Sequence, residues 1–262
     1  MVGRFGSYIL EVWQCRELIL VLAKRDLQVQ YAQTMLGVLW SLLQPLAAML
    51  IYTLFFSQLV VLPGVDAPYA LFVFTGILIW SNFSTILTQA GTSLMQNQQI
   101  IKKIYFPRLV LLLAKVAVSW VEFSISFCLL LVIAFWVGHP LPWTLVFVPL
   151  VVVVNATVAL SLAVWLSVLT IRFRDFYHLV PLVISFGIWF TPVFYPGTIL
   201  PERWMFLLHF NPVAGVIHLM RWAVLGDGLD PSYLAVLAGH GVLLLVGLVY
   251  FSRVEKKMVD YI

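Results

Sequence analysis

Long apolar segments dominate this sequence, and six of them are long enough to cross a lipid bilayer. About 20 apolar residues in helical form span a hydrocarbon core roughly 30 Å thick. Inside that core each backbone polar group must be paired within the protein, so runs of this length span as helices. The six segments are Leu36–Leu62, Ala70–Thr92, Leu109–Val137, Trp143–Ile171, Phe176–Tyr195 and Tyr233–Phe251. We therefore predict an all-α polytopic membrane protein of one domain, in which residues 32–262 form a six-span bundle.

The composition excludes an ordinary soluble domain. Hydrophobic residues make up 63% of the 262 residues and charged residues only 10%, against about 45–50% and about 25% in soluble proteins. The net charge of +4 could indicate a nucleic-acid partner in a soluble protein, but here we attribute it to membrane topology and expect no such partner. Because the longest early apolar run, Leu18–Ala23, is short, we expect the first span to serve as the insertion signal.

The basic residues indicate how the chain is oriented. Lysine and arginine concentrate in cytoplasmic segments of membrane proteins. Thirteen of the fifteen lie in the N-terminal tail, the second loop with its exit, the fourth loop and the C-terminal tail, and the other two, Arg203 and Arg221, lie in the fifth loop. This alternation predicts an even number of spans with both termini in the cytoplasm.

The segment before the first span mixes apolar and charged residues. Tyr8, Val12 and Trp13 alternate with charges such as Glu11 and Arg16, a composition typical of an amphipathic helix in the membrane interface. Residues 1–31 are therefore predicted to form a cytoplasmic interface helix. It could be a docking platform for a soluble partner or only a topological anchor.

The fifth loop, Pro196–Asp230, is long yet mostly apolar. Its two apolar runs, Trp204–Phe210 and Val213–Leu225, are too short to span and favour re-entrant helices, although helices lying flat on the membrane are an alternative. An asparagine followed by proline between them predicts a helix start. We expect the two helices to cover the periplasmic exit of the path as a gate, for which the candidate residues are Trp204, Asn211, Pro212 and Arg221.

Motifs for catalysis are not visible. The sequence has no phosphate-binding loop, dinucleotide fingerprint, zinc-protease pair or nucleophile elbow, and Cys15 and Cys128 have no metal spacing. We predict no enzyme activity, metal or cofactor in this chain. Lys115, Glu122 and His240 lie within spans, where ionisable residues are functional candidates, although Lys115 could instead be a snorkelling base and Glu122 an acid paired with a neighbour.

Five stretches resemble the permease subunits of ABC-type polysaccharide exporters, in the order of that family. They are KRDLQVQYAQTMLGVLWSLLQPLAAMLIYTLFF at 24–56, GILIW with SLMQNQQIIKKIYFPR within 76–114, IRFRDFYHLVPL at 171–182, TPVFYP with the later NP at 191–212, and RVEKKMVDYI at 253–262. One departure is Gln30, where the family commonly has arginine. The chain length and the motif residues are most similar to those of O-antigen exporter permeases, and capsule and teichoic-acid exporter permeases are close relatives.

The resemblance implies a function and partners. A homodimer of this subunit would bind two copies of a separate ATPase, which holds ATP and magnesium, and would export a polysaccharide linked to undecaprenyl diphosphate across the bacterial inner membrane. Rival interpretations are a drug or small-lipid exporter permease and a membrane glycosyltransferase.

The family's loop between spans two and three forms a coupling helix that contacts the ATPase. The matching residues here are Asn97, Gln98, Gln99, Lys102, Lys103, Tyr105 and Phe106. Exposed aromatic residues often anchor protein interfaces. The charged residues Arg172, Arg174 and Asp175 could either touch the ATPase or serve local topology.

Aromatic residues follow helical spacing on spans one and five. A sugar ring can stack its C–H face on an aromatic ring, and such stacking tolerates sliding of a polymer. Helix packing or interfacial belts would explain the same rings, but the resemblance favours a polysaccharide channel. The candidate channel residues are Trp40, Tyr52, Phe55, Phe56, Phe186, Trp189, Phe190 and Phe194.

Overall fold

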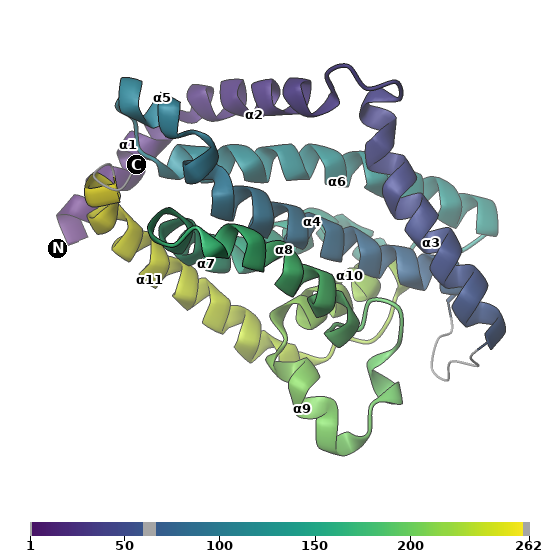
Figure 1. Cartoon of the computed structure of the whole chain (residues 1–262). Coiled ribbons are helices and arrows are strands. Elements are labelled where there is room, and N and C mark those ends of the chain that lie inside the picture. The colour runs from purple at the N-terminus through teal and green to yellow at the C-terminus, as the bar shows by residue number, and fades with distance from the viewer. Residues whose placement is uncertain (1, 60–66, 259–262) are drawn as a thin grey trace.

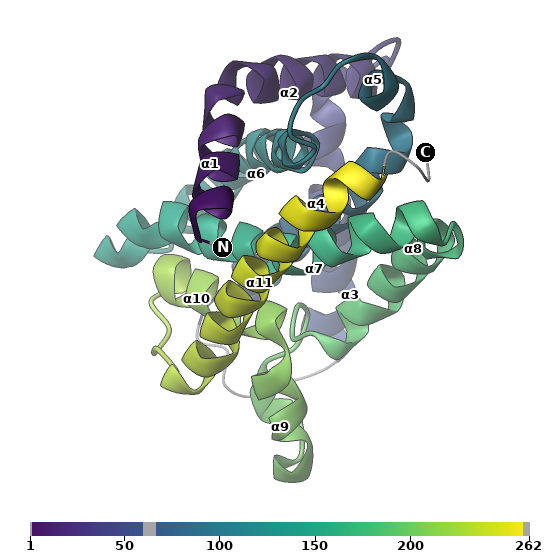
Figure 2. The ribbon, with the colours of Figure 1, turned by 90° about the vertical axis from the view of Figure 1, so that its left-hand side faces the viewer.

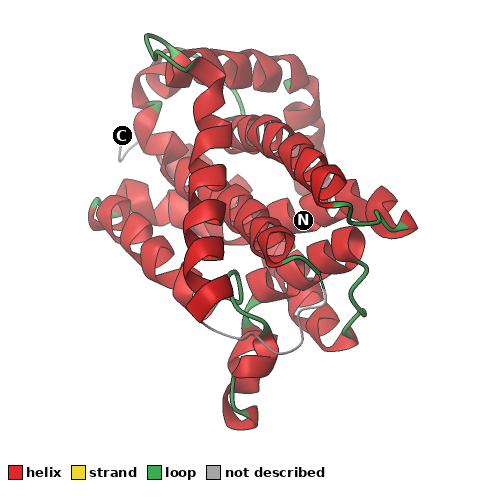
Figure 3. Ribbon diagram, turned by 90° about the vertical axis from the view of Figure 1, so that its right-hand side faces the viewer, coloured by secondary structure: helices red, strands yellow, loops and turns green. Residues whose placement is uncertain are grey.

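A computed structural model describes residues 2–59 and 67–258, and this part of the chain consists of helices and their connections, with no strand (Figures 1 and 3). The α-helices are α1 (Val2–Gln14), α2 (Arg16–Tyr31), α3 (Trp40–Leu59), α4 (Tyr69–Gln96), α5 (Gln98–Lys103), α6 (Leu109–Val137), α7 (Val148–Arg172), α8 (Asp175–Gly187), α9 (Glu202–Phe210), α10 (Pro212–Leu225) and α11 (Leu234–Met258). Short 3-10 helices cover Gly37–Leu39, Trp143–Phe147, Ile188–Phe190, Gly197–Ile199 and Pro231–Tyr233. The predicted all-α fold class is therefore confirmed over the described residues.

Within the described ranges, five helical segments are long and apolar enough to cross a membrane. They are Gly37–Phe55, Tyr69–Gln96, Leu109–Val137, Trp143–Arg172 and Pro231–Glu255. They correspond to five of the six predicted spans. Residues 60–62 of the first predicted span lie outside the described residues.

The fifth predicted span is shorter than expected. The helix over Asp175–Phe190 stops before Tyr195, the predicted end. Thr191 adopts an extended conformation, with φ −110° and ψ 137°. This follows from Pro192, because proline disfavours helical geometry in the residue before it and supplies no amide N–H.

Helix α4 is the centre of the bundle and packs against both α6 and α7. Gly91 allows close approach to α7, since a Cβ built there would lie 2.6 Å from a methyl of Leu166. Buried amides also join the three helices. Asn155 donates to Asn82 Oδ1 over 2.8 Å, and Asn82 donates to Ser119 Oγ over 2.8 Å.

The N-terminal segment is two helices rather than the single predicted one. Helices α1 and α2 meet at Cys15 and run in different directions (Figure 2). Helix α2 packs against α6, and its residues Leu22 and Ala23 are buried. Its place in the membrane interface stays a prediction.

The two short helices of the fifth loop form where the sequence predicts them. The Asn211 side chain caps α10 by accepting from the backbone N–H groups of Val213, at 3.0 Å, and Ala214, at 3.3 Å. Asp230 likewise accepts from Ser232 N–H at 2.9 Å before α11. Helix α10 packs against α4 and α7, whereas α9 projects from the bundle (Figure 1).

Candidate functional site

The predicted coupling residues surround α5, which lies at the same end of the bundle as α1 and the end of α11 (Figure 1). Lys102, Lys103 and Tyr105 are exposed there and form an accessible surface, and Gln99 is exposed on the same short helix. Asn97 and Phe106 are buried. These two candidates therefore hold the loop in place rather than offer contact area.

Polar contacts anchor this loop on both sides. Before α5, Arg25 Nη2 donates to Asn97 Oδ1 over 3.0 Å. After α5, the Arg108 backbone N–H donates to Glu255 Oε2 over 3.2 Å, and Tyr8 donates its hydroxyl proton to the same oxygen over 2.8 Å. The loop is thus tied to α2, α1 and α11.

The Tyr8 hydroxyl remains a donor in this arrangement. Burial, reinforced by the neighbouring Glu255 carboxylate, raises the pKa of Tyr8 well above its usual value. The Tyr8 hydroxyl is therefore protonated near neutral pH and can donate to Glu255. Four coupling candidates remain. Gln98 is half-buried at the start of α5, and Arg172, Arg174 and Asp175 are exposed where α7 ends and α8 begins.

Three of the predicted channel aromatics meet in one cluster. Tyr52 of α3 stacks on Phe194, with ring centroids 3.6 Å apart and planes inclined by 18°. Trp189 meets Tyr52 edge to face, with centroids 6.2 Å apart. The helical stripe predicted for span five ends before Phe194, because that residue lies in the turn after Pro192 and is buried, with 1% of its surface exposed.

The other channel candidates are not in that cluster. Trp40, Phe55, Phe186 and Phe190 are exposed on α3, α8 and the 3-10 turn that follows α8. The side chain of Phe56 lies outside the described residues. Whether a polymer passes along these rings stays a prediction.

Two gate candidates fix the turn after span five. Arg221 of α10 is buried, its guanidinium carbon lies 3.5 Å from the Phe72 ring centroid, and its Nη2 donates to Val193 O over 3.0 Å. Asn211 Nδ2 donates to Thr191 Oγ1 over 3.0 Å. The remaining gate candidates occupy α9, where Trp204 is partly exposed, and the first turn of α10, which Pro212 begins.

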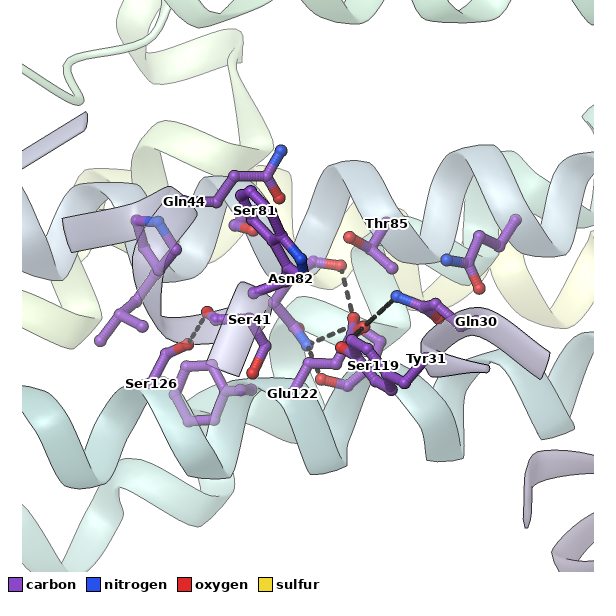
Figure 4. A pocket seen from close by; sticks show the side chains of 15 residues that line it. Gln30, Tyr31, Ser41, Gln44, Ser81, Asn82, Thr85, Ser119, Glu122 and Ser126 are labelled. Carbon is purple, nitrogen blue, oxygen red and sulfur yellow. Dashed lines mark hydrogen bonds between the residues drawn. The ribbon is translucent and has the colours of Figure 1, made fainter. Parts of the chain in front are cut away.

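A polar cavity of about 270 Å³ lies between the end of α2 and helices α3, α4 and α6 (Figure 4). Of its lining residues, the sequence singled out Trp40, Glu122 and Gln30, the last as a departure from the resembling family. The sequence held one more indication of this cavity: polar residues recur at every fourth position of an apolar span, at Ser81, Thr85 and Gln89. The polar lining residues are Gln30, Tyr31, Ser41, Gln44, Ser81, Asn82, Thr85, Gln89, Ser119, Glu122 and Ser126.

The charged residues of α6 contact α2. This confirms the neighbour predicted for Glu122, whereas Lys115, which was predicted to snorkel, forms an ion pair. Lys115 Nζ lies 2.8 Å from Asp26 Oδ2. Glu122 Oε1 accepts from Gln30 Nε2 over 2.6 Å and from the Tyr31 hydroxyl over 2.9 Å. Burial and the adjacent carboxylate raise the pKa of Tyr31 to about 12, so Tyr31 stays protonated as a donor.

The cavity contains both satisfied and unsatisfied polar groups. Asn82 and Ser119 are bonded to each other, and Ser126 donates to the Ser41 carbonyl over 3.0 Å. The side chains of Ser81 and Thr85 make no hydrogen bond to any residue that the structure describes, and the same holds for Gln44 and Gln89. Such a lining can bind and release a polar molecule.

Comparisons with known proteins cover nearly the whole chain. Residues 17–225 match the family described as ABC-2 type transporter. The O-antigen export system permease protein RfbA of Myxococcus xanthus is 32% identical over 251 residues, which cover 94% of this chain and 96% of that protein. RfbA of Klebsiella pneumoniae is 30% identical over 247 residues, 93% of this chain and 94% of that protein. The polysialic acid transport protein KpsM of Escherichia coli is 22% identical over 240 residues, 89% of this chain and 92% of that protein.

Proposed function

Because the chain belongs to the ABC-2 type transporter family, we propose that it is the permease of an ATP-driven exporter of polysaccharide linked to undecaprenyl diphosphate. The family membership and the relatives confirm the resemblance seen in the sequence. The relatives named for O-antigen export are more similar than the one named for polysialic acid transport. An O-antigen of lipopolysaccharide is therefore the first candidate cargo, and a capsular polysaccharide is the second.

The observation that carries this proposal is the anchored loop around α5. Its exposed face, with Lys102, Lys103 and Tyr105, offers a contact surface, while a part-buried hydrogen bond from Arg25 and a buried one to Glu255 hold its two sides. A movement of this loop would therefore be transmitted to α2 and α11 through these hydrogen bonds. This supports a loop that couples the bundle to a separate ATPase, which supplies the ATP and magnesium sites.

The proposed assembly is a homodimer with two ATPase subunits in the bacterial inner membrane. The excess of lysine and arginine in alternate segments supports six spans with cytoplasmic termini, the fifth being the shorter helix Asp175–Phe190. Helices α1 and α2 would occupy the cytoplasmic side, and α9 and α10 would re-enter from the periplasm. The polymer would pass Tyr52, Phe55, Trp189 and Phe190.

The test is ATP hydrolysis by the purified chain with and without its ATPase. The lone chain should show none, the complex should hydrolyse ATP, and deletion of Gln98–Tyr105 should prevent assembly while the chain still inserts in the membrane. Vigorous hydrolysis by the lone chain would disprove the assignment. Synthesis of glycosidic bonds by the lone chain would favour a membrane glycosyltransferase instead.

A further inference from the structure

We propose that the polar cavity binds one uncharged sugar unit of the exported polymer, an inference that rests on the proposed function. The cavity lies beside the middle of α4, a helix long enough to span the membrane. Ser81, Thr85 and Gln89 are spaced by four residues, so they share one face of that helix. At this depth a polar group without a partner is costly. Water or a polar ligand must therefore satisfy this face.

The opposite wall presents a carboxylate with a fixed orientation. Gln30 and Tyr31 both donate to Oε1 of Glu122, and Oε2 has no hydrogen-bond partner in the described part of the chain. The unsatisfied side chains across the cavity include amide and hydroxyl groups, as Figure 4 shows for Gln44, Ser81 and Thr85. Amides and hydroxyls both donate and accept, and a carboxylate accepts. Together they match the hydroxyl groups around a sugar ring.

The size and the aromatic residues fit one ring rather than a stretch of polymer. A volume of about 270 Å³ lies just below the range of about 300–1,000 Å³ that is usual for small-molecule sites. Trp40 and Phe123 also line the cavity, and an aromatic face suits the C–H face of a pyranose. A lipid chain would leave the polar stripe of α4 unsatisfied.

The charge of the cavity selects against acidic sugars. Glu122 is the acidic residue of the lining, which contains no lysine, arginine or histidine. The nearby Lys115 is already paired with Asp26 on α2. A second carboxylate placed in the cavity would be repelled, which weakens binding by about tenfold or more at the effective dielectric of a partly buried site.

Protection of a cysteine tests the site directly. Thr85→Cys is placed in a chain with Cys15→Ser and Cys128→Ala, and the intact complex with the ATPase is alkylated by N-ethylmaleimide. Methyl glucoside should slow alkylation several-fold, whereas methyl glucuronide at the same concentration should not. Adding Glu122→Gln should make the glucuronide protective too. A cysteine at Thr157, on an exposed face of α7, should be protected by neither probe.

No protection of the cysteine at position 85 would show that the cavity holds only water and would overturn the proposal. If methyl glucoside and methyl glucuronide protect equally in the chain that retains Glu122, the cavity does not select against acidic sugars.

Export in cells separates this inference from the proposed function. The double variant Ser81→Ala/Thr85→Val should lower surface polysaccharide at least about fourfold, because each lost hydrogen bond weakens binding roughly two- to tenfold. The matched double variant Ser84→Ala/Thr88→Val, on the same helix but outside the cavity lining, should export normally. If the cavity variant exports normally while deletion of the whole chain stops export, the cavity proposal fails and the proposed function stands.

Discussion

At the scale of single residues, an ion pair between Asp26 and Lys115 joins α2 and α6. Lys115 and Asp26 are mostly buried, with side-chain exposures of 11% and 13%. Breaking a buried pair leaves the other charge uncompensated and costs about 3–5 kcal/mol, whereas replacing both partners by apolar groups is often nearly neutral. We therefore expect the effects of replacing Asp26 and Lys115 on the free energy of unfolding to depend strongly on each other.

A double-mutant cycle tests that coupling. Asp26→Leu should lower the Tm of the purified complex strongly, because Lys115 loses its partner. Lys115→Leu should lower it less, because Asp26 also accepts from Arg25 Nη2 over 2.6 Å. The double variant should recover part of the loss. Additive effects in the thermal unfolding curves would show that the two side chains do not stabilise each other.

The sequence could identify Lys115 and Glu122 as two turns apart on one helix, but it could not name their partners. Asp26, Gln30 and Tyr31 come from a segment about 90 residues earlier, and only tertiary packing brings them to α6. Gln30 stands where an arginine is common in the resembling family, and here its amide donates to Glu122. An arginine at position 30 would instead form an ion pair with Glu122 and neutralise the negative charge of the cavity.

At the scale of elements, local sequence predicted the helices well and the end of span five poorly. Asparagine and proline at 211 and 212 start α10 as expected, because the cap is formed within a few residues. The aromatic spacing around Trp189 suggested a helix through Phe194, but Pro192 ends it. Proline restricts the residue before it, but Pro45 and Pro181 lie inside α3 and α8, so proline alone does not predict where a helix of this chain ends.

Phe190 and Phe194 were predicted to lie on one helical stripe, but the turn after span five places them in different surroundings. Phe194 is buried against Tyr52, whereas Phe190 is 75% exposed. Phe194→Ala should destabilise the protein by about 3–5 kcal/mol through the cavity that it leaves. Phe190→Ala should leave stability nearly unchanged and reduce only export. Thermal unfolding together with surface polysaccharide would measure both, and an equal loss of stability in the two variants would contradict this packing.

At the scale of the whole molecule, a permease bundle is expected to couple two ends. The anchored loop around α5 lies at the end where α1 begins and α11 finishes (Figure 1). Arg221 and Asn211 hold the turn after span five, and the polar cavity lies within the bundle. The central claim of the proposed function is that transport by this chain depends on ATP hydrolysed by a separate subunit.

Translocation in reconstituted vesicles tests that claim most directly. The chain and its ATPase would be placed in liposomes containing a radiolabelled polysaccharide linked to undecaprenyl diphosphate, with the ATPase facing outward. A glycosidase added outside would report how much polymer remains accessible. We predict that ATP makes the polymer progressively resistant to the enzyme, and that liposomes with either subunit alone show no change. Protection that develops without ATP, or with the chain alone, would contradict the account.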